Sequence, residues 1–437
     1  MEKLLEMARK VSDQAEVFSI DEKQNRVSFE NAMLKNITSS IQSGMSLRII
    51  KGDKVGFAYT KNLLDRDGFV QNALDGLKGG AEAPADFPKT IKIPLLNTYD
   101  PSIDSVTNET MVEECQRICD KFTGKTSAQL NLYAGLSTKT IRLLNSQGTD
   151  LTCKTSYYHI APLVLYPGSY SSIYRTFVRK SFEKTPEDIL AHILNTFLAS
   201  ENEVNPVAGR MKVLFLPESL HVLMWRLQSA TNGKMLHQKQ SPLAGKIEEK
   251  IFDEKLTILD DPLNDGDPGA RAFDDEATPC SSLPLVEKGV LKNYYYDLFY
   301  AKKLEAEPSG HGYKSAMWGR DTVSLKPGPS LEHLYIEPGD LTLAEMIRTM
   351  DRGFIVGQTL GAHSGNIPNG DFSIGLSPGL YIENGEIIGH VKDAMVAGNI
   401  YKTLRNVIAI ENTQHFSSGG CFPAILLDDV NVSTKKG

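Results

Sequence analysis

The chain reads Gly357-Gln-Thr-Leu-Gly-Ala-His-Ser-Gly-Asn366 and then Asn369-Gly-Asp-Phe-Ser-Ile-Gly-Leu-Ser-Pro-Gly-Leu380, two runs rich in glycine and short polar residues. Glycine adopts a positive φ without steric cost and lets a ligand or a second chain approach the backbone closely. The runs therefore indicate tight loops on a β scaffold. Two interpretations stay open here: a binding or catalytic surface, or a turn-rich β domain whose glycines serve only its corners.

A β-hairpin is predicted directly after these runs, over residues 380–391. Tyr381 and Ile382 lead into an Asn384-Gly385 turn, and the apolar residues from Ile387 onward lead out of it. Asn-Gly flanked by apolar residues is the strongest short-range signal for a two-residue hairpin turn. The segment that ends at Ala397-Gly-Asn399 is thus expected to be mainly β structure.

Composition excludes several classes of protein. The 437 residues are 41% hydrophobic and 23% charged, which is ordinary for a globular protein long enough for two or more domains. The formal net charge of −7 gives no global electrostatic basis for binding nucleic acid or a membrane surface. Direct binding to nucleic acid and association with a membrane are therefore not expected.

The cysteines and the N-terminus indicate a cytoplasmic protein. An odd and small number of cysteines favours a reducing compartment over a disulfide framework. The first ten residues form an amphipathic helix pattern rather than a signal peptide, and no segment approaches the roughly 20 apolar residues that span a membrane. The five cysteines are Cys115, Cys119, Cys153, Cys280 and Cys421.

Two domains are predicted, with fold class α+β. The boundary falls in the polar segment 201–210, which contains Pro206 and Gly209. An N-terminal mixed α/β sheet domain is expected at 1–200 and a β-rich, barrel- or sandwich-like domain at 210–437. The elements expected from apolar periodicity and helix caps are strands at 15–20, 27–31, 44–50, 55–60, 130–166 and 211–216, and helices at 61–78, 105–122, 185–200, 217–230 and 341–351.

Known catalytic and metal-binding motifs fail when they are tested. No His-Glu dipeptide exists, so the helix that offers two imidazoles and a carboxylate base on one face is absent. The acidic run 260–267 does not fit a calcium loop, because apolar residues fall at ligand positions. The segments 124–126 and 361–365 have the wrong spacing for a phosphate loop and for a nucleophile elbow.

Three groups of polar residues remain as candidates. His363 and Ser364 lie in the glycine-rich segment, His415 and Cys421 flank a serine- and glycine-rich turn, and the acidic run 274–276 follows an apolar residue. Each has an ordinary structural interpretation, since a single histidine or cysteine is usually a packed or hydrogen-bonded residue.

Short motifs along the whole chain resemble the TldD/PmbA family, cytoplasmic peptidase proteins also described as modulators of DNA gyrase. Their order and spacing carry the resemblance more than any single motif. The motifs are Ala15-Glu-Val-Phe18, Gly44-Met-Ser-Leu-Arg48, Gly56-Phe-Ala58, Asp260-Asp-Pro262, Ala272-Phe-Asp-Asp-Glu276, Gly289-Val-Leu291, Asn369-Gly-Asp-Phe-Ser373, Ile382-Glu-Asn-Gly-Glu386 and Ala397-Gly-Asn399.

The family has two branches, and the resemblance favours the one without a zinc helix. The TldD branch looks like a zinc metallopeptidase, with a His-Glu-x-x-x-His helix and a later cysteine ligand. The PmbA branch, also called TldE, lacks that helix motif and pairs with TldD. Here the corresponding helix, 217–227, keeps only His221, and Cys421 corresponds to the cysteine ligand. One histidine and one cysteine do not make the three-ligand site that zinc catalysis needs.

The resemblance implies a PmbA/TldE-like subunit of a cytoplasmic metallopeptidase that acts on unfolded peptides. No catalytic residue and no cofactor are expected in this chain, zinc is expected in a TldD-like partner, and the isolated chain is expected to be a homodimer. The glycine-rich strands would hold the peptide by backbone pairing. The residues expected to bind substrate are Gly361, His363, Asn369, Asp371 and Ser373.

Two alternatives from other classes are kept. One is a self-sufficient metallopeptidase whose divergent site is built from His363, His415 and Cys421. It requires the three side chains to lie within reach of a single metal ion. The other is a non-enzymatic binding protein that modulates DNA gyrase.

Overall fold

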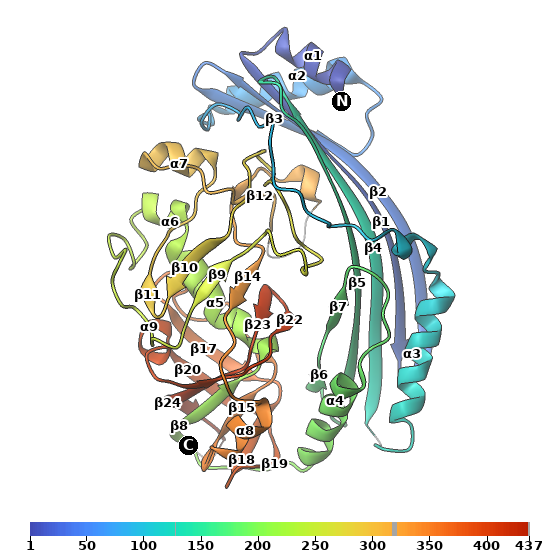
Figure 1. Ribbon diagram of the computed structural model, residues 1–437, viewed down its shortest axis with the longest axis vertical. Coiled ribbons are helices and arrows are strands. Elements are labelled where there is room, and N and C mark those ends of the chain that lie inside the picture. Colours follow the sequence, from blue (N-terminus) through green and yellow to red (C-terminus); the bar gives the residue numbers. More distant parts are fainter. Residues whose placement is uncertain (127, 317–320, 436–437) are drawn as a thin grey trace.

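A long, curved antiparallel sheet forms the N-terminal part of the molecule (Figure 1). The computed structural model describes residues 1–126, 128–316 and 321–435. In this sheet the strand order is β3-β2-β1-β4-β5-β6, and β7 also pairs with β5. The strands are β1 Gln14–Glu30, β2 Met33–Lys51, β3 Lys54–Thr60, β4 Gln129–Asn145, β5 Asp150–Leu165, β6 Ser172–Tyr174 and β7 Phe177–Arg179.

The strands of this sheet are longer than the sequence predicts. The expected strands at 15–20 and 27–31 are one continuous strand, β1, and the expected strand at 44–50 is the end of β2. The polar residues between the two expected strands at 15–20 and 27–31 suggested a loop. In the structure β1 pairs with β4 without a break from Glu16 to Phe29, so β-sheet pairing continues through the polar residues. Polarity here reflects exposure of the side chains and not a break in the strand.

Helices cover the two ends of the sheet. α1 and α2 pack at one end around Val17 and Leu47, and α3 and α4 pack near the other. Cys115 and Cys119 face the core from α3 as buried thiols. The helices of this part are α1 Glu2–Arg9, α2 Arg66–Gly76, α3 Asn108–Phe122 and α4 Glu187–Ala199, with 3₁₀ helices η1 Leu77–Gly79 and η2 Pro101–Ser105.

Two larger sheets with a helix between them, and the separate two-stranded sheet β12-β13, form the C-terminal part. A nine-stranded sheet has the order β16-β17-β20-β24-β8-β15-β18-β19, with β21 beside β24, and a six-stranded sheet has the order β11-β10-β9-β14-β23-β22. The strands are β8 Gly209–Phe215, β9 Ile258–Asp260, β10 Leu283–Glu287, β11 Val290–Leu291, β12 Gly312–Tyr313, β13 Gly328–Pro329, β14 Leu334–Ile336, β15 Arg352–Val356, β16 Thr359–Leu360, β17 Asp371–Leu376, β18 Gly379–Glu383, β19 Glu386–Val391, β20 Met395–Asn399, β21 Val407–Ile410, β22 His415–Ser417, β23 Gly420–Phe422 and β24 Ile425–Ser433.

The central helix α5 contributes to the core shared by these two sheets. Its residues Leu220, Leu223 and Leu227 are fully buried in one apolar cluster with residues of both sheets. This arrangement confirms the predicted α+β class with a curved, β-rich C-terminal part. The helices here are α5 Pro217–Thr231, α6 Gly233–His237, α7 Leu298–Leu304, α8 Leu343–Arg348 and α9 Ile400–Thr403, with the 3₁₀ helix η3 Thr322–Ser324.

The hairpin predicted around Asn384-Gly385 is confirmed. β18 and β19 pair antiparallel, with Glu383 opposite Glu386 across the turn. Asn384 and Gly385 have φ values of 53° and 79°, and a two-residue turn of this kind requires positive φ at both positions. The glycine-rich segment is therefore embedded in the nine-stranded sheet.

The N-terminal and C-terminal parts meet at both ends of the long sheet. At one end, Arg48 of β2 is paired with Glu16 of β1 and with Glu276 from the C-terminal part. At the other, residues of α3 and α4 share an apolar core with strands of the nine-stranded sheet. Among the helices of the described ranges, none is long and apolar enough to cross a membrane.

Candidate functional site

The half-buried face of α5 forms one wall of a cavity in the C-terminal part. Proline at the first helical position fixes φ where the helix begins, and leucine side chains anchor the opposite face in the core. The half-buried residues His221, Trp225, Gln228, Ser229 and Asn232 recur at helical spacing along the other face and line the cavity. A helix that is apolar on one side and mixed on the other thus presents a row of ligand-accessible groups.

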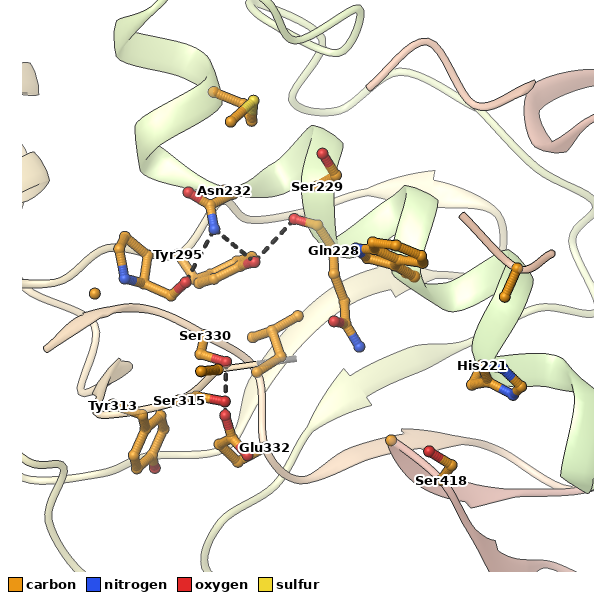
Figure 2. Close-up of a pocket in the computed structure, with 18 of the residues that line it drawn as sticks. His221, Gln228, Ser229, Asn232, Tyr295, Tyr313, Ser315, Ser330, Glu332 and Ser418 are labelled. Atoms are coloured by element: carbon orange, nitrogen blue, oxygen red, sulfur yellow. Dashed lines mark hydrogen bonds between the residues drawn. The ribbon is translucent and has the colours of Figure 1, made fainter. Parts of the chain in front are cut away.

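The cavity has a volume of about 740 Å³, which is within the range of ligand pockets. Its opposite wall comes from loops of the C-terminal part, and His363 and Ala362 close it from the glycine-rich segment. Figure 2 shows Gln228 and Ser330 from opposite walls of this space. The remaining lining residues are Met235, Tyr295, Tyr313, Ser315, Ala316, Lys326, Gly328, Pro329, Ser330, Leu331, Glu332, Ser418 and Gly419.

A second cavity of about 360 Å³ continues the first toward the N-terminal sheet. The two cavities share Leu331, Glu332, Ser418 and Gly419 as lining residues. The second is also lined by Tyr157 of β5 and by residues of and beside β7. Together they form a groove that runs from α5 to the inner face of the long sheet. We name this feature the α5 groove.

Hydrogen bonds fix the end of the groove near Asn232. The Asn232 side-chain amide donates to Tyr295 Oη and to the Pro329 carbonyl, each at 3.0 Å, and Tyr295 Oη donates to the Gln228 carbonyl at 2.9 Å (Figure 2). On the facing wall, Ser330 Oγ donates to Glu332 Oε1 at 2.6 Å. The side chains that shape this end are therefore held in place without a ligand.

The buried guanidinium of Arg226 attaches the glycine-rich segment to α5. It donates to the carbonyls of Asp371 at 2.7 Å, Ser364 at 2.7 Å and Ala362 at 3.1 Å. Burial lowers the pKa of Arg226 to about 10, although the Asp371 carboxylate opposes that shift. The loop that carries His363 is thus positioned by three main-chain contacts to one cation.

The structure separates the five residues expected to bind substrate. His363 lines the groove. Asp371 and Asn369 instead accept hydrogen bonds from the side-chain amide of Asn399, at 2.9 and 2.8 Å. Gly361 has a positive φ of 72°, and its carbonyl accepts a hydrogen bond from the main-chain N–H of Ser364. Ser373 lies in β17, opposite a residue of β20. Only His363 of the five is among the groove-lining residues.

The glycine-rich strands differ in how far their edges are occupied. β18 is paired along its whole length with β15 and with β19, so its backbone has no free row of donors and acceptors. β17 is paired with β20 from Asp371 to Gly375, but with β16 only at Gly375 and Leu376. The expectation that these strands hold the peptide by backbone pairing is therefore wrong for β18 and stays a prediction for β17.

The alternative metal site built from His363, His415 and Cys421 is not formed. Within residues 1–126, 128–316 and 321–435, no group of three or more histidine, cysteine, aspartate or glutamate side chains is arranged to hold a metal ion. His363 lines the α5 groove, whereas His415 lies 3.4 Å from Glu411 Oε1 and 3.4 Å from a guanidinium nitrogen of Arg175. His415 and Cys421 lie on the paired strands β22 and β23, but His415 is engaged with Glu411 and Arg175. The prediction of a shared metal site is therefore wrong for this structure.

His221 and Cys421, the two weaker metal candidates, belong to no group of three candidate ligands among residues 1–126, 128–316 and 321–435. Burial lowers the pKa of His221, and its Nδ1 lies 3.1 Å from the Glu218 carbonyl, an environment that is compatible with a neutral imidazole ligand. Burial, with a contribution from Asp267, raises the pKa of the Cys421 thiol to about 12. Two candidate ligands do not make the three-ligand site of a catalytic zinc ion.

A buried ion pair lies beneath the start of α5. Arg175, from the connection between β6 and β7, donates through Nε to Glu218 Oε1 at 2.9 Å, and both side chains are at most 5% exposed. Glu218 is therefore held by the N-terminal part of the molecule and is not directed into the α5 groove, which it does not line. It is engaged in a structural role in this conformation.

Sequence reasoning missed most of the groove. The spacing of His221, Trp225 and Gln228 opposite a leucine stripe could have indicated an accessible helix face. No local signal connects that face to Tyr295 or Glu332, because these residues are brought together only by the tertiary fold.

Comparison with known proteins assigns the chain to a family. The sequence model of the PmbA/TldA metallopeptidase C-terminal domain matches residues 208–434, more than half of the chain, and that of PmbA/TldA metallopeptidase domain 1 matches residues 15–82. The chain belongs to the PmbA/TldD family.

Relatives of this PmbA/TldD-family chain span nearly its full length. An uncharacterized protein of Methanocaldococcus jannaschii is 26% identical over 95% of both chains. A zinc metalloprotease TldD homolog of Saccharolobus solfataricus is 21% identical over 89% of this chain and 86% of its own. The crystal structure of TldE from Thermococcus kodakarensis matches with a TM-score of 0.90 and 22% identity over 99% of both chains, which shows a shared fold.

Proposed function

We propose that this chain is the PmbA/TldE-like, non-hydrolytic subunit of a cytoplasmic TldD/TldE-type metallopeptidase, and that it binds an extended, unfolded peptide in the α5 groove. A TldD-like partner chain would supply the zinc site. The observation that carries the proposal is which residues α5 presents to the groove. It presents one imidazole, His221, and then Trp225, Gln228 and Asn232, where a hydrolytic site would need further ligands and a base.

The residues present do not fit a catalytic zinc ion. Zinc catalysis needs three protein ligands and an open position, with each ligand deprotonated toward the metal. Here the groove face of α5 offers one imidazole, His221, no group of three candidate ligands is arranged around a metal position among the described residues, and Glu218 is paired with Arg175. No hydrolytic step is therefore assigned to this chain.

The groove instead suits a peptide held largely by its backbone. β22 is the edge strand of the six-stranded sheet, and Phe416 and Ser417 of this strand line the second cavity. An extended peptide can add to such an edge through main-chain hydrogen bonds, a mode that tolerates many sequences. Trp225, on the α5 wall, would cover one apolar side chain of the peptide.

Binding can be tested with a fluorescein-labelled disordered peptide and fluorescence anisotropy. We expect Trp225→Ala to weaken binding about tenfold, because loss of one aromatic contact at a binding site costs roughly 1–2 kcal/mol. Tyr170→Ala is the matched control, since Tyr170 is an aromatic side chain that is 97% exposed and lines neither cavity of the groove.

Equal affinities for the wild type, Trp225→Ala and Tyr170→Ala would exclude the α5 groove as the binding site. Circular dichroism of each variant separates loss of binding from loss of folding. Pairing with a TldD-like chain is tested separately, by isolating this chain from native extract and identifying the chain that accompanies it.

A further inference from the structure

Strand β2 has a long edge without a β partner. On the side away from β1, β3 pairs with it only from Met45 to Lys51. In the part of the chain that the structure describes, no other strand pairs with this side, so residues 33–44 are open there. An edge of this length presents a row of unpaired main-chain donors and acceptors.

The side chains of this edge are unusually apolar and uncharged for an exposed strand. Ile41 is 78% exposed, Met33 68%, Leu34 47% and Ile37 43%. From residue 36 to residue 43 the sequence is Asn-Ile-Thr-Ser-Ser-Ile-Gln-Ser, without a charge or a proline. Monomeric proteins usually block such an edge with lysine, proline or a bulge. The only charge here is Lys35, which lies with a break in the β1–β2 register at one end of the edge and leaves residues 36–43 without such a block.

We propose that the free edge of β2 pairs antiparallel with the same edge of a second copy of this chain, about a two-fold axis at Ser39. In this register residue i of one copy lies opposite residue 78 − i of the other. Ile37 of each copy is then opposite Ile41 of its partner, and Thr38 is opposite Ser40. The axis also lies at the middle of the free edge, so neither copy's β3 obstructs the other.

The self-complementary pattern supports this register. Successive side chains alternate between the two faces of a strand, so Ile37 and Ile41 lie on one face together with Ser39. Two cross-strand pairs of β-branched apolar residues would form on that face, and between residues 36 and 42 only uncharged polar pairs would form on the other. A shift of the register between the two copies by one residue would place Ile37 opposite Ser40. The isoleucine side chains would then lose their apolar cross-strand partners.

Pairing would also enlarge the inner surface of the molecule. Thr38 and Asn36 lie across from Arg26 and Ser28 of β1, and these four residues are among those that line a hollow of about 450 Å³ on the sheet. In the paired sheet the hollows of the two copies would face each other across the axis on one continuous surface. The interface stands independently of peptide binding in the α5 groove.

Disulfide trapping of Ser39→Cys tests the register. Residues directly opposite in an antiparallel pair have Cα atoms about 4.5–5.5 Å apart, within the range that a disulfide spans. We expect mild oxidation to convert Ser39→Cys to a covalent dimer. Ser43→Cys is the matched control, because its two copies would lie about 27 Å apart in this register. The wild type controls for the native cysteines, of which only Cys153 is not buried.

Sedimentation velocity then tests the interface without a cross-link. The wild type is expected to dimerise with concentration, and Ile41→Lys to raise the dissociation constant about tenfold or more, because one charge enters each of the two apolar pairs. Ile91→Lys is the control, since Ile91 is 79% exposed and lies outside the sheet. A monomeric wild type, a dimer insensitive to Ile41→Lys, or equal cross-linking of Ser39→Cys and Ser43→Cys would each overturn the proposal.

Discussion

The junction around Arg48 and the α5 groove use polar residues in opposite ways. At the junction, Arg48, Glu16 and Glu276 are each at most 6% exposed and are paired at 2.7–2.8 Å. In the groove, Trp225 and Gln228 are half-buried and face open space. Charges without access to water must be paired to be tolerated, whereas half-exposed neutral groups can exchange water for a ligand. The junction therefore holds the long sheet in place, and the groove remains able to bind.

Removing the charge of Arg48 should have the largest effect. Arg48→Met removes the guanidinium that pairs with two buried carboxylates, and we expect a loss of about 3–5 kcal/mol in the free energy of unfolding. Chemical denaturation measures this loss. Lys61→Met is the control, because the Lys61–Asp321 pair at 2.8 Å is about half exposed and should contribute less than about 1 kcal/mol. Similar losses in the two variants would contradict the contrast between buried and exposed pairs.

Arg226 shares a property with each region: it is a buried cation, like Arg48, and it supports the groove. Arg226→Met should cost about 2–4 kcal/mol, because three main-chain carbonyls lose their donor. We also expect faster proteolysis within residues 361–371, which its guanidinium holds. Limited proteolysis with mass spectrometry locates the cleavage. Unchanged cleavage in this loop would show that other contacts hold it.

The junction should also make stability depend on pH through Lys314. Burial, and then the nearby Arg48, lower the pKa of Lys314 to about 7, although Asp275, Glu16 and Glu276 oppose this shift. Its Nζ donates to Ser46 Oγ at 2.9 Å and to the Leu325 carbonyl at 2.7 Å.

Between pH 7 and the ordinary lysine pKa near 10.5, the unfolded chain binds a proton that the folded chain does not. The contribution of Lys314 to stability therefore rises as pH increases across this window and is lost as pH falls toward 7. We expect the Tm difference between wild type and Lys314→Met to change by an amount that corresponds to about 1–3 kcal/mol from pH 7 to pH 9.5. A constant difference would contradict the lowered pKa.

Gln228→Ala should have the smallest effect and should change binding alone. The Gln228 side chain projects into the groove in Figure 2. We expect peptide affinity to fall about two- to fivefold, the size of one neutral hydrogen bond, with the free energy of unfolding unchanged within about 0.5 kcal/mol. A loss of stability equal to the loss of binding would show that the groove is part of the structural core.

The comparison also shows how far the sequence alone reaches. The hairpin at Asn384-Gly385 and the helix that begins at Pro217 were predictable, because turn residues and helix caps act locally. The length of β1 was not, because its polar middle looks like a loop until the pairing with β4 is known.

The site was predicted less well than the fold. His363 was selected from the glycine-rich segment and does line the groove, but Asp371 and Asn369 are engaged with Asn399. The decisive wall comes from α5, whose role depends on which of its faces the two sheets leave open. A single sequence does not contain that tertiary information.

The most direct test of the central claim is to measure metal content, peptide binding and peptide cleavage on the same preparation of the isolated chain. We predict less than stoichiometric zinc by elemental analysis, binding of a disordered peptide that a chelator does not change, and no cleavage of that peptide. Stoichiometric zinc together with chelator-sensitive cleavage by the isolated chain would contradict a non-hydrolytic, peptide-binding subunit.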